Sequence, residues 1–169
     1  MFGNEDVKPP TIANVTSLSQ RLSRWLIRTP VVRCRSIEDW LDTDAEIYGK
    51  LEFLQQTGTF KPRGALANVL ALDDAQRAAG ITAVSAGNHA IGAAFAAKAV
   101  GTNAKVVMIR SASQVRIDAC KALGAEIVFA DSHHHAFDLV EEIGEQEGRV
   151  FIHPFEGVTT VTGTGTIGL

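Results

Sequence analysis

The chain has 169 residues, of which 46% are hydrophobic and 21% charged, a composition typical of a globular protein with one substantial core. Its net charge of −3 offers no basic field for nucleic acid or an acidic membrane surface, which favours small-molecule chemistry. No secretory signal begins the sequence, and no run of about eighteen apolar residues could span a membrane. We therefore expect a cytoplasmic protein without nucleic-acid or membrane partners.

The N-terminal part is predicted to hold an irregular arm over residues 1–16 and then one helix. Ser17 and Gln20 have the spacing of a capping box, and the apolar residues that follow share one helical face. Pro30 is expected to end this helix, because the residue before a proline is pushed out of the helical region. Three short elements are predicted next: a strand at 31–34, a turn of helix at 37–41 and a strand at 46–52.

A first junction of interest follows that last strand. A Thr57–Gly58 turn leads into a helix that Pro62 opens, because proline suits a first helical position. Lys61 is thereby placed at a strand-to-helix junction, where its side chain can project into a cleft. The alternative is an ordinary surface lysine, which describes most lysines.

A second junction spans residues 85–90, with the sequence SAGNHA. It follows a predicted buried strand at 81–85 and precedes a helix rich in small residues. A strand, a glycine turn and a helix start present free backbone N–H groups and a positive helix end to an anion. A lysine at one junction and an anion cradle at another are what a site for an amino acid needs.

From residue 81 onward, strands and helices alternate every twenty-odd residues. Strands are predicted at 81–85, 104–109, 126–130 and 149–153, and helices at 89–100, 113–123 and 136–147. Such repeats with Val/Ile-rich strands imply parallel pairing and right-handed crossovers. We therefore predict an α/β fold with a four-stranded parallel sheet covered by helices.

Residues 163–168 satisfy the pattern G-x-G-x-x-G near the end of the chain. The pattern fails as a dinucleotide fingerprint, because no strand leads directly into it and no acidic residue follows at the required distance. We expect this segment to be the start of a helix instead.

The two junctions carry a pair of long motifs, KLEFLQQTGTFKPRGA at 50–65 and SAGNHA at 85–90. Together they resemble the serine/threonine dehydratases, or threonine ammonia-lyases, among the pyridoxal-phosphate enzymes of the tryptophan-synthase-β-like fold (fold type II). The resemblance runs from about Ser17 onward and implies an N-terminal half. Residues 1–72 would belong to the large cofactor domain, 73–158 to a small α/β subdomain with helices on both faces, and 159–169 to a truncated return to the large domain.

The resemblance also assigns roles. Lys61 would form the Schiff base with pyridoxal phosphate and then remove the α-proton of a small amino-acid substrate. Phe60 would position the cofactor, with a core aromatic as the alternative. Asn88 would hydrogen-bond the cofactor's ring hydroxyl, with a turn-stabilising asparagine as the alternative.

The substrate carboxylate would be surrounded by the second junction, through Ser85, Ala86, Gly87, Asn88 and His89. A satisfied residue at a helix N-terminus is an equal alternative for His89. The motif residues Arg63 and Glu52 are expected to be structural.

Position 86 separates relatives within the family. Serine racemases of this fold have a second serine there, which delivers a proton to the opposite face of the carbanion, and Ala86 cannot do so. The resemblance therefore favours elimination of water from L-threonine or L-serine, giving a 2-oxo acid and ammonia. The alternatives are a serine racemase and a catalytically silent α/β fragment that binds protein partners or nothing.

Three further expectations concern metals, completeness and assembly. The triplet at 133–135 suggests a metal site, but adjacent histidines cannot all point one way, so a solvated loop and no metal site are predicted. The resemblance implies a second half that carries a glycine-rich loop for the cofactor phosphate, so we expect this chain to be a fragment. Apolar faces left exposed would favour a homo-oligomer, and a clean monomer would contradict it.

Overall fold

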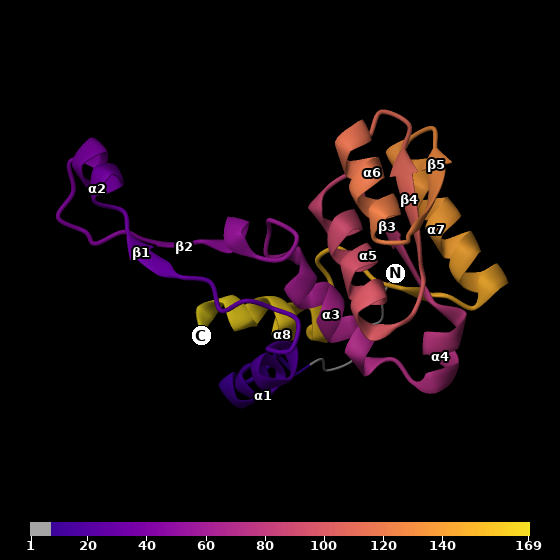
Figure 1. The fold of residues 1–169 in the computed structure, drawn as a ribbon, viewed down its shortest axis with the longest axis horizontal. Helices are drawn as coiled ribbons and strands as arrows, with labels where there is room; N and C mark the ends of the chain where they lie inside the picture. The colour runs from indigo at the N-terminus through magenta and orange to yellow at the C-terminus, as the bar shows by residue number, and fades with distance from the viewer. Residues whose placement is uncertain (1–7) are drawn as a thin grey trace.

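The computed structural model describes residues 8–169 (Figure 1). The helices are α1 (Ile12–Leu22), α2 (Arg35–Leu41), α3 (Lys61–Ala71), α4 (Asp74–Ala79), α5 (Asn88–Val100), α6 (Gln114–Ala122), α7 (His133–Glu147) and α8 (Val158–Gly165). The strands are β1 (Val31–Arg33), β2 (Tyr48–Lys50), β3 (Ile81–Val84), β4 (Ala104–Ile109), β5 (Glu126–Ala130) and β6 (Val150–Phe151). Short 3₁₀ turns cover Glu52–Leu54 and Thr166–Gly168.

The predicted four-stranded parallel sheet is confirmed. Its strand order is β5-β4-β3-β6, and every neighbouring pair is parallel. In Figure 1, α5 and α6 lie on one side of this sheet and α7 on the other. Val106 and Met108 of β4 join the core beneath α5 and α6, whereas Val107 joins the cluster beneath α7. All three side chains are fully buried, which is why the parallel strands have continuous Val/Ile-rich sequences.

The capping box predicted at Ser17 is wrong, because the first helix begins earlier. Thr11 has an extended backbone, and its side chain accepts a hydrogen bond from Asn14 N at 3.3 Å. The Asn14 side chain in turn accepts from Thr11 N at 2.9 Å, which completes a capping box with asparagine in place of glutamate. Part of the predicted irregular arm is therefore helix, and its first seven residues lie outside the described part of the chain. The helix ends at Leu22, well before Pro30.

The segment from β1 to β2 forms a separate antiparallel pair in which Val31 lies opposite Lys50. Figure 1 shows this pair and α2 extending away from the rest of the molecule. The strand predicted at 46–52 is shorter than expected, because the chain turns into a 3₁₀ helix directly after Leu51. Trp40 on α2 is 82% exposed, so this extension has little core of its own.

The C-terminal segment also differs from the prediction. Strand β6 has two residues rather than five, and α8 begins at Val158, before the glycine pattern rather than within it. Helix α8 packs on α1 and α3 (Figure 1). A Cβ built on Gly163 would lie 2.6 Å from Arg63 O and 2.9 Å from Gly64 Cα. Gly163 therefore serves the close crossing of α8 and α3.

The larger hydrophobic cluster joins residues on both sides of the predicted domain boundary at 72/73. It includes Leu22 of α1, Leu66 of α3, Ala93 of α5 and Ile152 after β6. The proposed division into 1–72, 73–158 and 159–169 stays a prediction. Within residues 8–169, no helix has the length and apolar character needed to cross a membrane.

Candidate active site

Lys61 is the first residue of α3, one position earlier than the predicted helix start. Its amine donates a hydrogen bond of 2.7 Å to Pro154 O, and it lies 5.1 Å from the centre of the Phe60 ring. The residue is half-buried, and burial lowers the pKa of Lys61. Its amine is therefore directed into the protein, which argues against an ordinary surface lysine.

The second junction forms as predicted at the carboxyl end of β3. Gly87 N donates to Ser85 Oγ at 3.0 Å, so the serine hydroxyl stabilises the turn. Helix α5 then starts at Asn88 without a capping side chain. In the described part of the chain, no acceptor pairs with the backbone N–H of Asn88 or His89. These two groups at the positive end of α5 can receive an anion.

The two junctions lie against each other through α3, α5 and the segment after β6. A Cβ on Gly92 of α5 would be 3.1 Å from the backbone carbon of Lys61, so the helices cross with little room between them. His89 Nε2 lies 2.9 Å from Ile152 O, and Lys61 bonds the carbonyl two residues further on. Both side chains thus meet the carboxyl end of β6, which pairs with β3. Ligands of open α/β sheets bind at this edge.

The ring of His89 already has a hydrogen-bond partner, which agrees with the alternative of a satisfied residue at a helix N-terminus. Its side chain is buried, and burial lowers the pKa of His89 to about 4, although the bond to Ile152 O opposes this shift. A carbonyl can only accept, so the neutral ring carries its proton on Nε2 and donates it to Ile152 O. The backbone N–H of His89, rather than its ring, is the group that can bind an anion.

Asn88 does not stabilise the turn. Its side chain is exposed and has no hydrogen-bond partner within residues 8–169, while Ser85 performs the turn-stabilising role. The amide of Asn88 is therefore available to a ligand.

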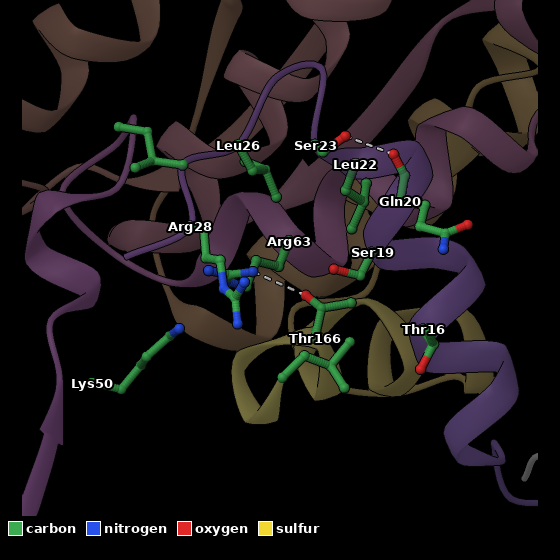
Figure 2. A pocket seen from close by; sticks show the side chains of 12 residues that line it. Thr16, Ser19, Gln20, Leu22, Ser23, Leu26, Arg28, Lys50, Arg63 and Thr166 are labelled. Carbon is green, nitrogen blue, oxygen red and sulfur yellow. Dashed lines mark hydrogen bonds between the residues drawn. The ribbon is translucent and has the colours of Figure 1, made fainter. Parts of the chain in front are cut away.

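Two cavities lie near these elements. One of about 440 Å³ is lined by Phe60, Lys61, Pro154, Phe155, Thr160, Val161, Thr164 and Gly165. It brings together Phe60 and Lys61 but none of the residues at 85–89. The other, of about 580 Å³, is lined by residues of α1, by Lys50 of β2 and by Leu169. Figure 2 shows Arg28, Lys50, Arg63 and Thr166 around it.

Arg63 and Glu52 form the buried ion pair that their expected structural role requires. Arg63 Nε and Nη2 donate to the two carboxylate oxygens of Glu52, each at 2.8 Å. Thr29 also donates to Glu52, and Arg63 reaches Thr166 of the C-terminal segment at 3.1 Å (Figure 2). The pair therefore ties three distant parts of the chain together.

The family is given by comparison with known proteins. The sequence profile of the family described as pyridoxal-phosphate dependent enzyme matches residues 22–169. The chain belongs to this family. Phenylserine dehydratase of Ralstonia pickettii is 50% identical over 159 residues, which make up 94% of this chain and 48% of the relative. L-threonine dehydratase catabolic TdcB of Escherichia coli K12 is 36% identical over 162 residues, 95% of this chain and 49% of the relative.

Solved structures of the pyridoxal-phosphate dependent family agree with the observed fold. Maize serine racemase has a TM-score of 0.88 at 32% identity, covering 95% of this chain and 48% of that one. The threonine deaminase of T.th. has a TM-score of 0.84 at 34% identity, covering 94% of this chain and 50% of that one. The α/β architecture is therefore that of fold type II. The chain spans about half the length of the curated relatives it matches.

The residues present fit pyridoxal phosphate, on which the family depends. A half-buried lysine amine forms part of a cavity wall, and an aromatic ring lies beside it. The exposed amide of Asn88 and the uncapped N–H groups of α5 add hydrogen-bond donors. An amine for covalent attachment and donors for polar ring groups are what this cofactor needs.

The structure corrects the prediction that the histidine triplet at 133–135 lies in a loop. His133, His134 and His135 form the first turn of α7 rather than a loop, because Ser132 caps the helix by accepting from His135 N at 3.1 Å. The rings of His134 and His135 lie near Asp138 and Asp131, each 3.7 Å away. Within residues 8–169, no group of three or more His, Cys, Asp or Glu side chains converges as a metal site would.

Sequence reasoning missed three residues that lie at these junctions. Pro154 supplies the carbonyl that accepts from Lys61, and Phe155 exposes 64% of its surface beside the same cavity. Arg116 of α6 contacts the turn at Ala86. The available signal for Pro154 and Phe155 was their place just after a parallel strand, where sites of α/β sheets form. No motif identifies Arg116.

Proposed function

We propose that this chain supplies the lysine and the carboxylate cradle of a pyridoxal-phosphate dependent dehydratase. The reaction is elimination of water from L-threonine or L-serine, which yields a 2-oxo acid and ammonia. One observation carries the proposal: the half-buried amine of Lys61 donates at 2.7 Å to Pro154 O, in the segment whose Ile152 O also binds the ring of His89 at the uncapped start of α5. The relatives named threonine dehydratase and phenylserine dehydratase support the reaction class.

Lys61 is the group proposed to hold the cofactor covalently and, as a free amine, to accept the α-proton of the substrate. When bound, pyridoxal phosphate accepts the electron pair left on the substrate Cα. A lysine can act as a base near neutral pH when burial lowers its pKa, and the pKa of Lys61 shifts in that direction. Phe60 would help to position the cofactor, and the side chain of Asn88 would donate to its ring hydroxyl.

The turn after β3 is proposed to hold the substrate carboxylate. The backbone N–H groups of Asn88 and His89 are the donors, and the positive end of α5 adds a favourable field. Ser85 holds the turn through Gly87 N. Ala86 has no hydroxyl that could return a proton, which favours elimination over racemisation.

A second substrate, 3-phenylserine, is favoured by a specific pair of observations. The relative that shares 50% of its residues with this chain is named phenylserine dehydratase. Phe155 presents an exposed ring beside the cavity of Lys61, where a phenyl group at the substrate β-carbon could pack. Rates of 2-oxo acid formation from 3-phenylserine, L-threonine and L-serine, compared in one preparation, would rank the three substrates.

The test of the proposed function is a Lys61-dependent absorbance. Addition of pyridoxal phosphate to the chain is expected to give the visible band of a lysine-bound cofactor, and Lys61→Ala should abolish it. Lys98→Ala is the matched control, because Lys98 is an exposed lysine of α5 whose amine donates to Ala122 O at 3.4 Å. An intact circular-dichroism spectrum without a Lys61-dependent band would contradict the proposal and favour a catalytically silent α/β fragment.

The pH dependence of that band is a separate prediction. Only a neutral amine attacks the cofactor carbonyl, and burial lowers the pKa of Lys61. The rate of band formation should therefore reach its midpoint below the value of about 10.4 for an unperturbed lysine. Stopped-flow absorbance from about pH 7 to about pH 11, with N-acetyl-lysine amide as the reference amine, measures it. Equal pH midpoints for the chain and for N-acetyl-lysine amide would contradict the prediction.

A further inference from the structure

Arg116 of α6 reaches the turn that the proposed function assigns to the substrate carboxylate. Its Nη1 atom donates to Ala86 O at 3.3 Å. A Cβ built on Gly87 would lie 2.8 Å from the same nitrogen and 3.9 Å from the guanidinium carbon. The guanidinium therefore lies directly against the peptide that joins Ala86 to Gly87.

That peptide is held at both of its polar atoms. Its carbonyl, Ala86 O, accepts from Arg116, and its N–H, on Gly87, donates to Ser85 Oγ at 3.0 Å. A trans peptide directs its carbonyl and its N–H to opposite sides, so the two bonds together determine the orientation of the peptide plane. The first N–H groups of α5 follow directly from this plane.

The direction of the carbonyl matters for an anion. Helix α5 packs on α3 and on α6, and Figure 1 shows it between them. Lys61 begins α3 on one side of α5, whereas Arg116 lies on α6 on the other side and reaches Ala86 O. Held toward α6, Ala86 O is kept away from a carboxylate that it would repel, and glycine at 87 leaves room for the guanidinium.

Arg116 is not committed to an ion pair in the described part of the chain, in contrast to Arg110, which binds Asp131 at 2.7 Å. Its charge therefore adds to the positive potential at the start of α5.

We propose that Arg116 is a positioning residue of the carboxylate cradle, which holds the Ala86–Gly87 peptide so that the first N–H groups of α5 face the substrate carboxylate. The inference rests on the proposed function, because it assumes that this turn receives an amino-acid carboxylate. Arg116 acts through the backbone of the turn and touches neither the cofactor nor the reacting atoms.

The test uses the cofactor-free chain and L-serine as the probe, with backbone amide shifts of Asn88 and His89 followed by NMR. Arg116→Gln should weaken L-serine binding at these amides about tenfold, which is about 1.4 kcal/mol. Arg116→Lys, which keeps a charged donor, should restore affinity to within about threefold. Arg110→Gln, a matched loss of one exposed arginine, should leave affinity unchanged.

A second readout separates positioning from a general structural role. Arg116→Gln should speed hydrogen exchange of Gly87 N–H, because its peptide loses one of two anchors, while the melting temperature stays within about 2 °C. Equal L-serine affinity in Arg116→Gln, an equal loss in Arg110→Gln, or no shift at Asn88 and His89 in the parent chain would each overturn the inference. A missing Lys61-dependent band with intact L-serine binding would overturn the proposed function alone.

Discussion

Replacement of Arg63 by methionine is expected to lower the free energy of unfolding by about 3–5 kcal/mol. The change leaves the carboxylate of Glu52, whose side chain is only 12% exposed, without the two hydrogen bonds that neutralise it. It also removes the bond from Arg63 to Thr166, which ties α3 to the C-terminal segment. Urea unfolding followed by circular dichroism measures the loss.

The matched control is Arg110→Met, which breaks the ion pair with Asp131 on the surface. Both side chains of that pair are more than two-thirds exposed, so the loss should be within about 1 kcal/mol. Equal losses in the two variants would show that burial does not distinguish the pairs. The double variant Arg63→Met with Glu52→Leu should be more stable than Arg63→Met alone, because no unpaired charge stays buried.

The effect of Arg63 should also depend on pH. Burial by itself would raise the pKa of Glu52, but hydrogen bonds from Arg63 and Thr29 outweigh it, and the pKa is lowered overall. A lowered folded-state pKa gives stability that is fully present above the unfolded value of about 4.3. This contribution is lost as the pH falls through the folded-state pKa. The difference between parent chain and Arg63→Met should therefore shrink below about pH 4.

Gly163→Ala is expected to destabilise the chain by about 1–3 kcal/mol. The new Cβ would lie 2.6 Å from Arg63 O and 2.7 Å from Ala67 Cβ, so α8 and α3 must separate. Neither contact involves the end of a flexible side chain, so the strain cannot be relieved by a rotamer change. Alanine has a better helix propensity than glycine by about 1 kcal/mol, and the measured loss is net of that gain.

Gly168→Ala is the control for this prediction. Nothing lies within 4 Å of a Cβ at Gly168, which belongs to the same glycine pattern. The free energy of unfolding of the Gly168→Ala variant should stay within about 0.5 kcal/mol of the parent value. Equal effects at the two glycines would contradict the assignment of Gly163 to helix crossing.

The βα repeat was predictable because its signals are local. The strands β4 and β5 begin and end where predicted, since their runs of apolar and β-branched residues are bounded by turns. Helix ends were less predictable. Thr11 and Ser17 both offer a capping hydroxyl, and Thr11 is the residue that caps α1, with Asn14 completing the box. The short β6 likewise depends on its one neighbour, β3.

The candidate site was predictable only in its motifs. Lys61 and the turn at 85–89 were recognisable because each lies at a strand-to-helix junction of characteristic sequence. Their contacts were not: Pro154 is 93 residues from Lys61, and Ile152 is 63 residues from His89. The part that Gly163 of the G-x-G-x-x-G pattern plays in packing α8 on α3 could not be predicted without the partner helix.

By itself, the sequence determined the class of fold and the identity of the two chemical motifs, because hydrophobic patterns and junction residues act over a few positions along the chain. Only the tertiary structure decided that the Lys61 amine bonds Pro154 O, that the ring of His89 bonds Ile152 O, and that Arg116 donates to Ala86 O. The physical reason is that each of these depends on burial and on a carbonyl supplied by a distant segment. Such contacts are set by packing in three dimensions and leave no periodic trace in the sequence.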